Sequence, residues 1–261
     1  MNGLKAALWT ETLKVRRSWM PWLTVLGGSF APIIGGLFML ILKDPAWARD
    51  RGLISAKAQL AAGTADWPTL WGMLAQAVAV GGLVLFGLIV IWTFGREWSD
   101  RTAKDLLALP TSRSAIVSAK FITVGVWSTL IAALIFVEGL GIGSLVDIPG
   151  WSSDLLREAA WKIGTTAALM VALVTPFAWA ASAGRGYLPP TGAMFLVLVL
   201  AQVLAALGWG AVFPWSIPAL ASGIAGPATA QLGLGSYLLV ILVGIVGVAG
   251  TLVWWQYADQ V

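Results

Sequence analysis

The charged side chains of this protein gather in one short segment between two long apolar stretches. Residues 94–121 read FGREWSDRTAKDLLALPTSRSAIVSAKF, and ten consecutive residues there contain six charges: Arg96, Glu97, Asp100, Arg101, Lys104 and Asp105. The whole chain of 261 residues has only 16 Lys and Arg and 12 Asp and Glu. Such a segment either forms a solvated loop, packs on its own protein, or offers ion pairs and leucine contacts to a partner.

Few of the usual catalytic side chains are present elsewhere. The chain has no His and no Cys, which excludes imidazole acid–base chemistry, thiol nucleophiles, disulfides and Cys/His metal sites. Glu138 and Asp147 are nine residues apart and form no convincing acid pair. A Ser/Lys pair or an acid pair that only folding brings together remains an alternative, and it would make the protein an intramembrane enzyme. No G-x-x-x-x-G-K-[ST] segment occurs, so any ATP hydrolysis must take place in another chain.

The composition is that of a membrane protein. Hydrophobic residues make up 59% of the chain and charged residues 11%, with a mean hydropathy of +0.85, whereas soluble domains contain roughly 25% charged residues. The net charge of +4 is small and informs about orientation, so we expect no nucleic-acid partner. The N-terminal segment has charges on both sides of its apolar residues and is not expected to be a removable signal peptide.

Long uncharged runs predict the membrane spans, because a hydrocarbon core of about 30 Å requires about 20 apolar helical residues. Proline and glycine residues divide the last run, of 73 residues between Arg185 and Asp259, into two spans. The sequence therefore predicts one all-α transmembrane domain over residues 1–261, with six transmembrane helices at about 22–42, 71–94, 121–146, 163–183, 191–212 and 233–256.

Basic residues predict the orientation of these spans. Ten Lys and Arg fall on the side of the two termini, including five between Arg96 and Lys120, and six fall on the other side. The positive-inside rule then places both termini in the cytoplasm of a multi-pass protein of the plasma (inner) membrane.

Residues 3–20 predict a helix that lies in the membrane plane before the first span. Leu4, Leu8, Val15 and Trp19 share one side at 100° per residue, whereas the opposite side contains Thr10, Glu11, Lys14, Arg17 and Ser18. An ordinary solvated helix is the alternative.

The charged segment contains its own helix signals. Thr102 followed by Asp105 fits a capping pattern, AKDLLAL is a run of good helix formers, and Pro110 stops it. Thr111 or Ser112 is placed to cap the next helix, which leads into the third span. We therefore expect a short surface helix within the connection 95–120.

Polar residues within the spans are candidates for the pathway or for helix packing. Glu138 is an acid inside an apolar run, and Gln76 and Gln202 can hydrogen-bond between helices. Gly244, Gly247 and Gly250 recur every third residue, which favours a close helix approach within the chain or between two copies.

The segment REWSDRTAKDLLALPTSRSAIVSAKF resembles the signature of the permease subunits of type 2 ABC exporters, especially the bacitracin and lantibiotic-immunity branch. The family pattern has an acid after the second span, then a Thr, a Leu-Leu step and Pro-x-Ser-Arg. In this chain the acid is Glu97, the Thr is Thr102, the Leu-Leu step is Leu106 and Leu107, and the last motif is Pro110, Ser112 and Arg113. The segment ETLKVRRSW is also similar to the elbow helix of that family. Asp100 and Arg101 stand where the family usually has Gly or Ser-Gly.

The resemblance implies that this segment is a coupling helix docked in a groove of a separate cytoplasmic ATPase subunit. It also implies two ATPase copies that bind ATP and Mg²⁺, no cofactor or metal in this chain, and a permease homodimer or a pair of related permeases. The cargo of an exporter with so apolar an interior is expected to be amphipathic: a peptide antibiotic, drug or lipid. A membrane scaffold or sensor that uses the same ATPase contact without transport is the main alternative.

Overall fold

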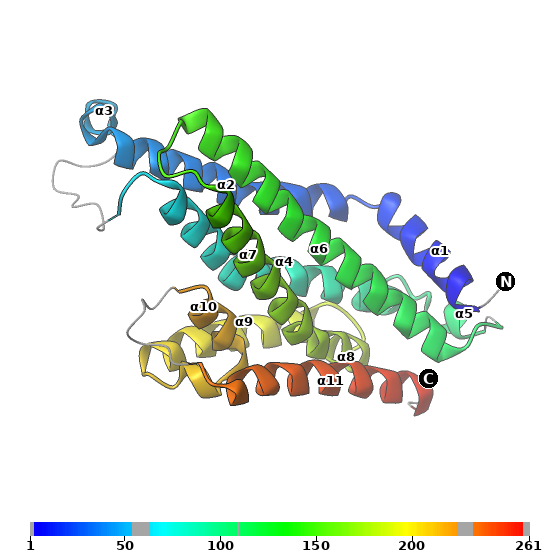
Figure 1. Ribbon diagram of the computed structural model, residues 1–261. Coiled ribbons are helices and arrows are strands. Elements are labelled where there is room, and N and C mark those ends of the chain that lie inside the picture. Colours follow the sequence, from blue (N-terminus) through cyan, green and yellow to red (C-terminus); the bar gives the residue numbers. More distant parts are fainter. Residues whose placement is uncertain (1–2, 54–62, 109, 224–231, 258–261) are drawn as a thin grey trace.

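The computed structural model describes residues 3–53, 63–108, 110–223 and 232–257, and all regular elements in these ranges are helices (Figure 1). Six of them, with α7 and α8 taken together, are long and apolar enough to cross a membrane. The first half contains α1 (Gly3–Arg16), α2 (Met20–Lys43), α3 (Pro45–Asp50), α4 (Trp67–Ser99), α5 (Ala103–Leu107) and α6 (Arg113–Val146). The second half contains α7 (Ser153–Leu173), α8 (Thr175–Ala183), α9 (Leu188–Ala206), η1 (Gly210–Val212), η2 (Pro214–Ser216), α10 (Ile217–Ala221) and α11 (Leu234–Tyr257). The predicted all-α membrane fold is confirmed.

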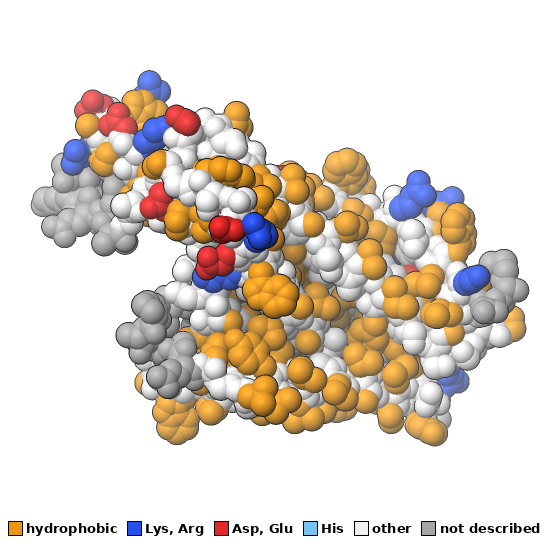
Figure 2. All heavy atoms as spheres, in the orientation of Figure 1, with side chains coloured by type: hydrophobic (Ala, Val, Ile, Leu, Met, Phe, Trp, Pro, Cys, Tyr) orange, Lys and Arg blue, Asp and Glu red, His pale blue; other side chains and the backbone are white. Residues whose placement is uncertain are grey.

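Helix α4 is the centre of the bundle. It packs against α2, α6, α7, α8 and α9, and 61% of its most apolar window is buried, against 17% for α9. In Figure 1 the helices run along the length of the molecule, and the ends of α1 and α11 that carry the two termini lie at the same end as α5. Hydrophobic side chains cover the middle of the face in Figure 2, and charged side chains gather toward its two ends.

Side-chain caps set the starts of three long helices. Asp66, Ser112 and Ser152 accept hydrogen bonds from the first-turn amides of α4, α6 and α7, respectively. Ser112 Oγ accepts from the main-chain nitrogen of Ala115 at 3.3 Å, as the sequence predicted for the helix that follows the charged segment. Helix α6 thus begins at Arg113, well before the span expected from residue 121.

The fourth span is longer than the predicted 163–183 and is broken at Val174. It runs from Ser153 to Ala183, with Pro176 just after the break. Because Pro176 has no N–H, the carbonyl of Ala172 loses its helical donor. The hydroxyl of Thr175 donates to that oxygen at 2.8 Å, and Trp215 Nε1 donates to the neighbouring carbonyl of Leu173 at 3.0 Å. The break is therefore compensated by side chains, as a nonaqueous environment requires.

The fifth span is shorter than the predicted 191–212. Helix α9 ends at Ala206, and Gly208 follows with a left-handed φ of +84°. The chain then turns back through η1, η2 and α10, which pack on α9, α4 and α7. Ser216 Oγ donates to the carbonyl of Ala201 at 2.8 Å. The glycine turn and η1 thus occupy the last six residues of the expected span, and two short proline-containing helices, η2 and α10, follow them.

The glycine row of the last span packs within the chain. A Cβ on Gly247 would lie 2.6 Å from the nitrogen of Pro176, and one on Gly244 would lie 3.1 Å from Cβ of Ala172. The single hydroxyl proton of Thr175 is shared between the carbonyl of Ala172 and that of Gly244, whose oxygen lies 3.0 Å from Thr175 Oγ1 across this contact. The row therefore brings α11 close to the α7–α8 break.

Candidate functional site

The segment between α4 and α6 is divided into an exposed part and an inward-facing part. Helix α5 has five residues, Ala103–Leu107, and Ala103 and Leu106 pack on the protein. Most residues that were predicted to contact an ATPase are exposed: Asp100, Arg101, Thr102, Lys104, Asp105, Pro110 and Ser112. The structure describes the backbone of Leu107 but not its side chain, and residue 109 lies outside the described residues. The predicted surface helix is present and shorter than AKDLLAL.

Glu97, the acid of the signature, is not on this surface: only 2% of it is exposed. Its Oε1 accepts hydrogen bonds from Lys14 Nζ at 2.6 Å and from Lys120 Nζ at 2.8 Å. Its Oε2 accepts from Thr102 Oγ1 at 2.8 Å. Within this chain the carboxylate therefore joins α1, the end of α4, the start of α5 and α6.

Lys120 and Glu11 complete a cluster of two acids and two bases, which we call the buried charge cluster (Glu11, Lys14, Glu97 and Lys120). Lys120 is fully buried, and its ammonium contacts Glu97, the Glu11 carboxylate at 3.2 Å and the carbonyl of Thr93 at 2.8 Å. All three of its donors have acceptors. Lys14 also pairs with Glu11 at 2.8 Å. The four formal charges cancel, which lowers the cost of burying each of them.

This cluster draws two residues of the predicted polar side of the N-terminal helix into the protein. Glu11 and Lys14 were placed on the polar side of residues 3–20, yet Glu11 is 3% exposed and both contact α4 or α6 through ion pairs. Thr10 and Arg17 of the same side are exposed. Partner charges on α4 and α6 thus bury part of the polar side, and the rest of it remains exposed.

The charge environment of Lys14 favours its protonated form. Burial by itself lowers the pKa of this ammonium, but the Glu11 and Glu97 carboxylates raise it by more, so the pKa of Lys14 is above its ordinary value of 10.5. Lys14 is therefore charged around neutral pH.

The start of α5 differs from the predicted cap. Thr102 is the N-cap residue, but its hydroxyl donates to Glu97 and accepts no first-turn amide. Arg101 precedes it with φ +59°, in the left-handed region where glycine is favoured. A glycine, which the family usually has here, adopts this left-handed conformation easily. Arg101 adopts it despite its side chain.

Arg113, at the end of the signature, faces the last helix. Its Nη1 donates to the carbonyl oxygens of Trp255 at 3.0 Å and Gln256 at 3.2 Å. A cation at the C-terminal end of a helix satisfies free carbonyls and stabilises the helix dipole. Arg113 therefore fixes the end of α11 to the start of α6.

The polar candidates within the spans do not meet in one site. Glu138 Oε1 accepts a hydrogen bond from Ser29 Oγ at 2.7 Å, which links α6 to α2, while its buried Oε2 has no partner among the described residues. Gln76 on α4 is partly buried, and Gln202 on α9 is exposed beside a small cavity of about 30 Å³. Only Glu138 thus has a defined helix-linking contact among the three.

The sequence analysis missed the part of the buried charge cluster outside the signature: Glu11, Lys14 and Lys120. A signal for it exists. Residues 1–43 contain one acid, Glu11, which lies close to a run of basic residues. Lys120 is the last charged residue before the apolar run of the third span. Two acids and two lysines at the same ends of three helices favour mutual pairing.

Six apolar helices define a multi-pass integral membrane protein. A short helix flanked by exposed charges lies at the end of the molecule that carries both termini.

Comparison with known sequences gives the family. The family described as ABC-2 family transporter protein matches residues 7–202, and the chain belongs to it. It is therefore the membrane-spanning permease of an ABC transporter, and such permeases work with cytoplasmic ATPase subunits.

A curated relative has a related name. The chain is similar to the bacitracin transport permease protein BCRB of Bacillus licheniformis, with 26% identity over 179 residues, which cover 68% of this chain and 85% of the relative. No solved structure matches the chain.

Proposed function

We propose that this permease is the membrane subunit of an ATP-driven exporter and that the exposed face of α5 and its flanking turns docks on a separate ATPase subunit. The observation that carries the proposal is the division of the charged segment. Asp100, Arg101, Lys104 and Asp105 are exposed, while Glu97 and Thr102 link the same segment to three other helices. Exposed charges suit recognition of a partner, and the buried ones suit transmission of its movement.

The transmission step follows from the contacts of Glu97. When two ATPase subunits bind ATP and Mg²⁺ and close, they displace α5. The Thr102–Glu97 hydrogen bond lies between α5 and α4, and Lys14 and Lys120 extend the link to α1 and α6. Displacement of α5 is then shared by two spans and the N-terminal helix rather than absorbed in a flexible loop. In this role Glu97 is a positioning residue behind the ATPase contact.

The cargo and the assembly belong to the same proposal. The bacitracin permease relative and the apolar lining of the bundle support an amphipathic cargo, such as a peptide antibiotic, moved out of the cytoplasm. Two permeases, identical or paired, form the pathway, and the termini lie in the cytoplasm of the inner membrane, where the ATPase binds.

Charge reversal on α5 tests the docking. Lys104→Glu combined with Asp105→Lys keeps the net charge and should abolish copurification of the ATPase and cargo-dependent ATP hydrolysis in vesicles. A matched control is Asp154→Lys combined with Arg157→Glu, which reverses an exposed ion pair of 2.9 Å at the start of α7 and should leave both unchanged. Normal ATPase binding by the α5 variant, with an unchanged unfolding temperature, would refute the docking.

A non-transporting scaffold or sensor would show the same ATPase contact. Reconstituted vesicles distinguish the two: an exporter accumulates labelled cargo when ATP is supplied, and a scaffold does not.

A further inference from the structure

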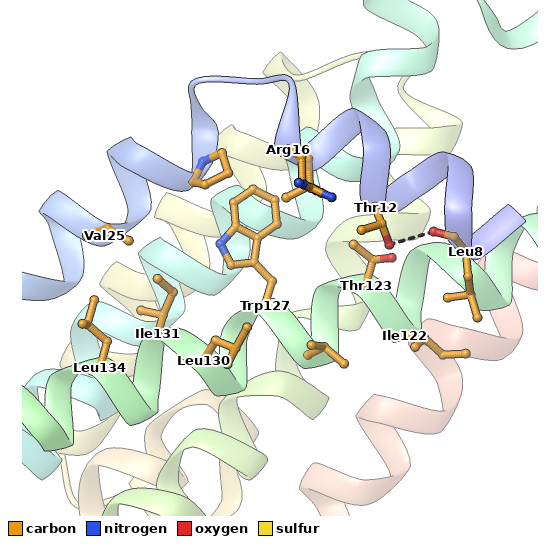
Figure 3. A pocket seen from close by; sticks show the side chains of 13 residues that line it. Leu8, Thr12, Arg16, Val25, Ile122, Thr123, Trp127, Leu130, Ile131 and Leu134 are labelled. Atoms are coloured by element: carbon orange, nitrogen blue, oxygen red, sulfur yellow. Dashed lines mark hydrogen bonds between the residues drawn. The ribbon is translucent and has the colours of Figure 1, made fainter.

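An apolar groove of about 650 Å³ lies between the end of α1, the start of α2 and one side of α6 (Figure 3). Its walls include Leu8 and Val15 of α1, Val25 of α2, and Val126, Leu130 and Leu134 of α6. Arg16 is the charged residue of its lining. Figure 3 shows it where α1 ends, between the part of the groove lined by Leu8 and the part lined by Val25. The groove is therefore apolar along its length, with one basic side chain at its rim.

The polar atoms inside the groove already have partners within the protein. Thr12 Oγ1 donates to the carbonyl of Leu8 at 2.8 Å, and Thr123 Oγ1 donates to the carbonyl of Ala119 at 2.9 Å. Trp127 Nε1 donates to Thr24 Oγ1 at 3.1 Å. The donors of these three side chains are therefore already in use, and a ligand of this groove meets mainly hydrocarbon along the walls.

The basic residue of the groove is unpaired. The guanidinium group of Arg16 has no hydrogen bond or ion pair within the part of the chain that the structure describes. Glu11 is the one acid among residues 1–43, and it is occupied by Lys14 and Lys120. An anion from outside the protein would thus meet the Arg16 side chain without competition from an acid of the protein.

The position of the groove relative to the bilayer follows from its neighbours. Trp19 and Trp22 are 80% and 66% exposed at the start of α2, as expected at a membrane–water interface. From Ile122 to Leu134 the groove follows α6 for twelve residues, or about 18 Å at 1.5 Å per residue, which is close to half of the roughly 30 Å hydrocarbon core. The groove therefore extends from headgroup level to about the middle of the bilayer.

We propose that this groove binds an anionic phospholipid of the leaflet on the side of the termini, with one acyl chain along α6 and the phosphate paired with Arg16. Charge complementarity selects this occupant: a long apolar slot with an unpaired cation at its rim, next to Trp19 and Trp22, fits one acidic headgroup and one tail. A bound lipid fills the space between α1 and α6, so it supports the helix that carries Glu11 and Lys14. The proposal does not depend on ATPase docking.

Native mass spectrometry of the full-length permease tests it, with phosphatidylglycerol and phosphatidylcholine as the added lipids. Wild type should retain phosphatidylglycerol in preference to phosphatidylcholine, and Arg16→Gln should weaken retention of phosphatidylglycerol roughly fivefold, the effect of one basic side chain near an anionic membrane surface. Arg157→Gln removes an exposed arginine far from the groove and should leave retention unchanged. Leu130→Trp narrows the groove from an exposed position, 63% exposed in the wild type, and should reduce retention of both lipids.

Equal retention of the two lipids by wild type, or an equal loss in Arg16→Gln and Arg157→Gln, would overturn the proposal. So would a lipid-free dimer in which the groove is covered by the second copy, or retention of an amphipathic peptide in place of lipid. Unfolding temperatures of both variants show that they are folded, and retention is compared only at matched stability.

Discussion

Lys120 on α6 and Glu97 on α4 form a buried ion pair, with Lys120 Nζ 2.8 Å from Glu97 Oε1. Both residues are at most 2% exposed, so bulk water cannot replace either partner of the pair. Removal of either partner leaves the buried charge cluster with one uncompensated charge, next to apolar groups such as the ring of Phe94, 5.8 Å from Lys120 Nζ. The pair therefore makes the junction of α4, α5 and α6 sensitive to single substitutions.

A double-mutant cycle measures this sensitivity. Glu97→Gln and Lys120→Met should each lower the free energy of unfolding by about 3–5 kcal/mol, because each leaves an uncompensated buried charge. The double variant should lose less than the sum of the two, as monitored by thermal or SDS unfolding in detergent. The control Asp100→Asn breaks the partly exposed 3.5 Å pair with Arg96 and should cost about 1 kcal/mol or less. Additive losses in the cycle would show that the two residues are not coupled.

Lys14 should make stability depend on pH in the alkaline range. Its folded-state pKa is raised above 10.5, so its contribution is complete below the unfolded-state pKa and is lost as the pH rises through the folded-state pKa. The difference in unfolding temperature between wild type and Lys14→Met should stay constant between about pH 7 and pH 10 and shrink above the ordinary lysine pKa of about 10.4. Lys104→Met, at an exposed position, provides the comparison. A difference that grows with alkalinity has the opposite sign and would contradict the assignment.

Arg101→Gly should stabilise the isolated permease. The left-handed φ of +59° costs a residue with a side chain roughly 1–2 kcal/mol, and the greater freedom of glycine in the unfolded chain offsets about half of that gain. We expect a net increase of about 0.5–1 kcal/mol in the free energy of unfolding. Lys104→Gly, in the middle of α5, should instead destabilise by about 1 kcal/mol. Equal effects of the two glycines would argue against the left-handed turn.

Gly247→Ala should destabilise the contact between α11 and α8. The added Cβ would lie 2.6 Å from the backbone nitrogen of Pro176 and 2.7 Å from the carbonyl carbon of Thr175. The two helices must therefore move apart. A loss of about 1–3 kcal/mol is expected for such overpacking. Gly235→Ala, in the same helix with open space around its Cβ, should be neutral or slightly stabilising. If both variants unfold at the same temperature, α11 does not pack on α8 as closely as described.

Local sequence patterns predicted much of this architecture. Uncharged runs of about 20 residues marked the six candidate spans because the thickness of the bilayer sets the length of an apolar helix. Ser112 and Pro110 marked the end of the charged connection and the start of α6, since caps and proline act on neighbouring residues. The signature from Glu97 to Arg113 also predicted the family to which the chain belongs.

The directions in which the charged residues face were decided by the tertiary structure. Lys14 and Glu97 are 83 residues apart, and Arg113 meets the carbonyl of Trp255 across 142 residues. A helical periodicity gives the side of a helix on which a residue lies, but it does not give the element that packs there. Glu11 and Glu97 face inward because complementary charges on other helices meet them. The sequence by itself determined the helices and the family, and only packing determined which charges remain exposed for a partner.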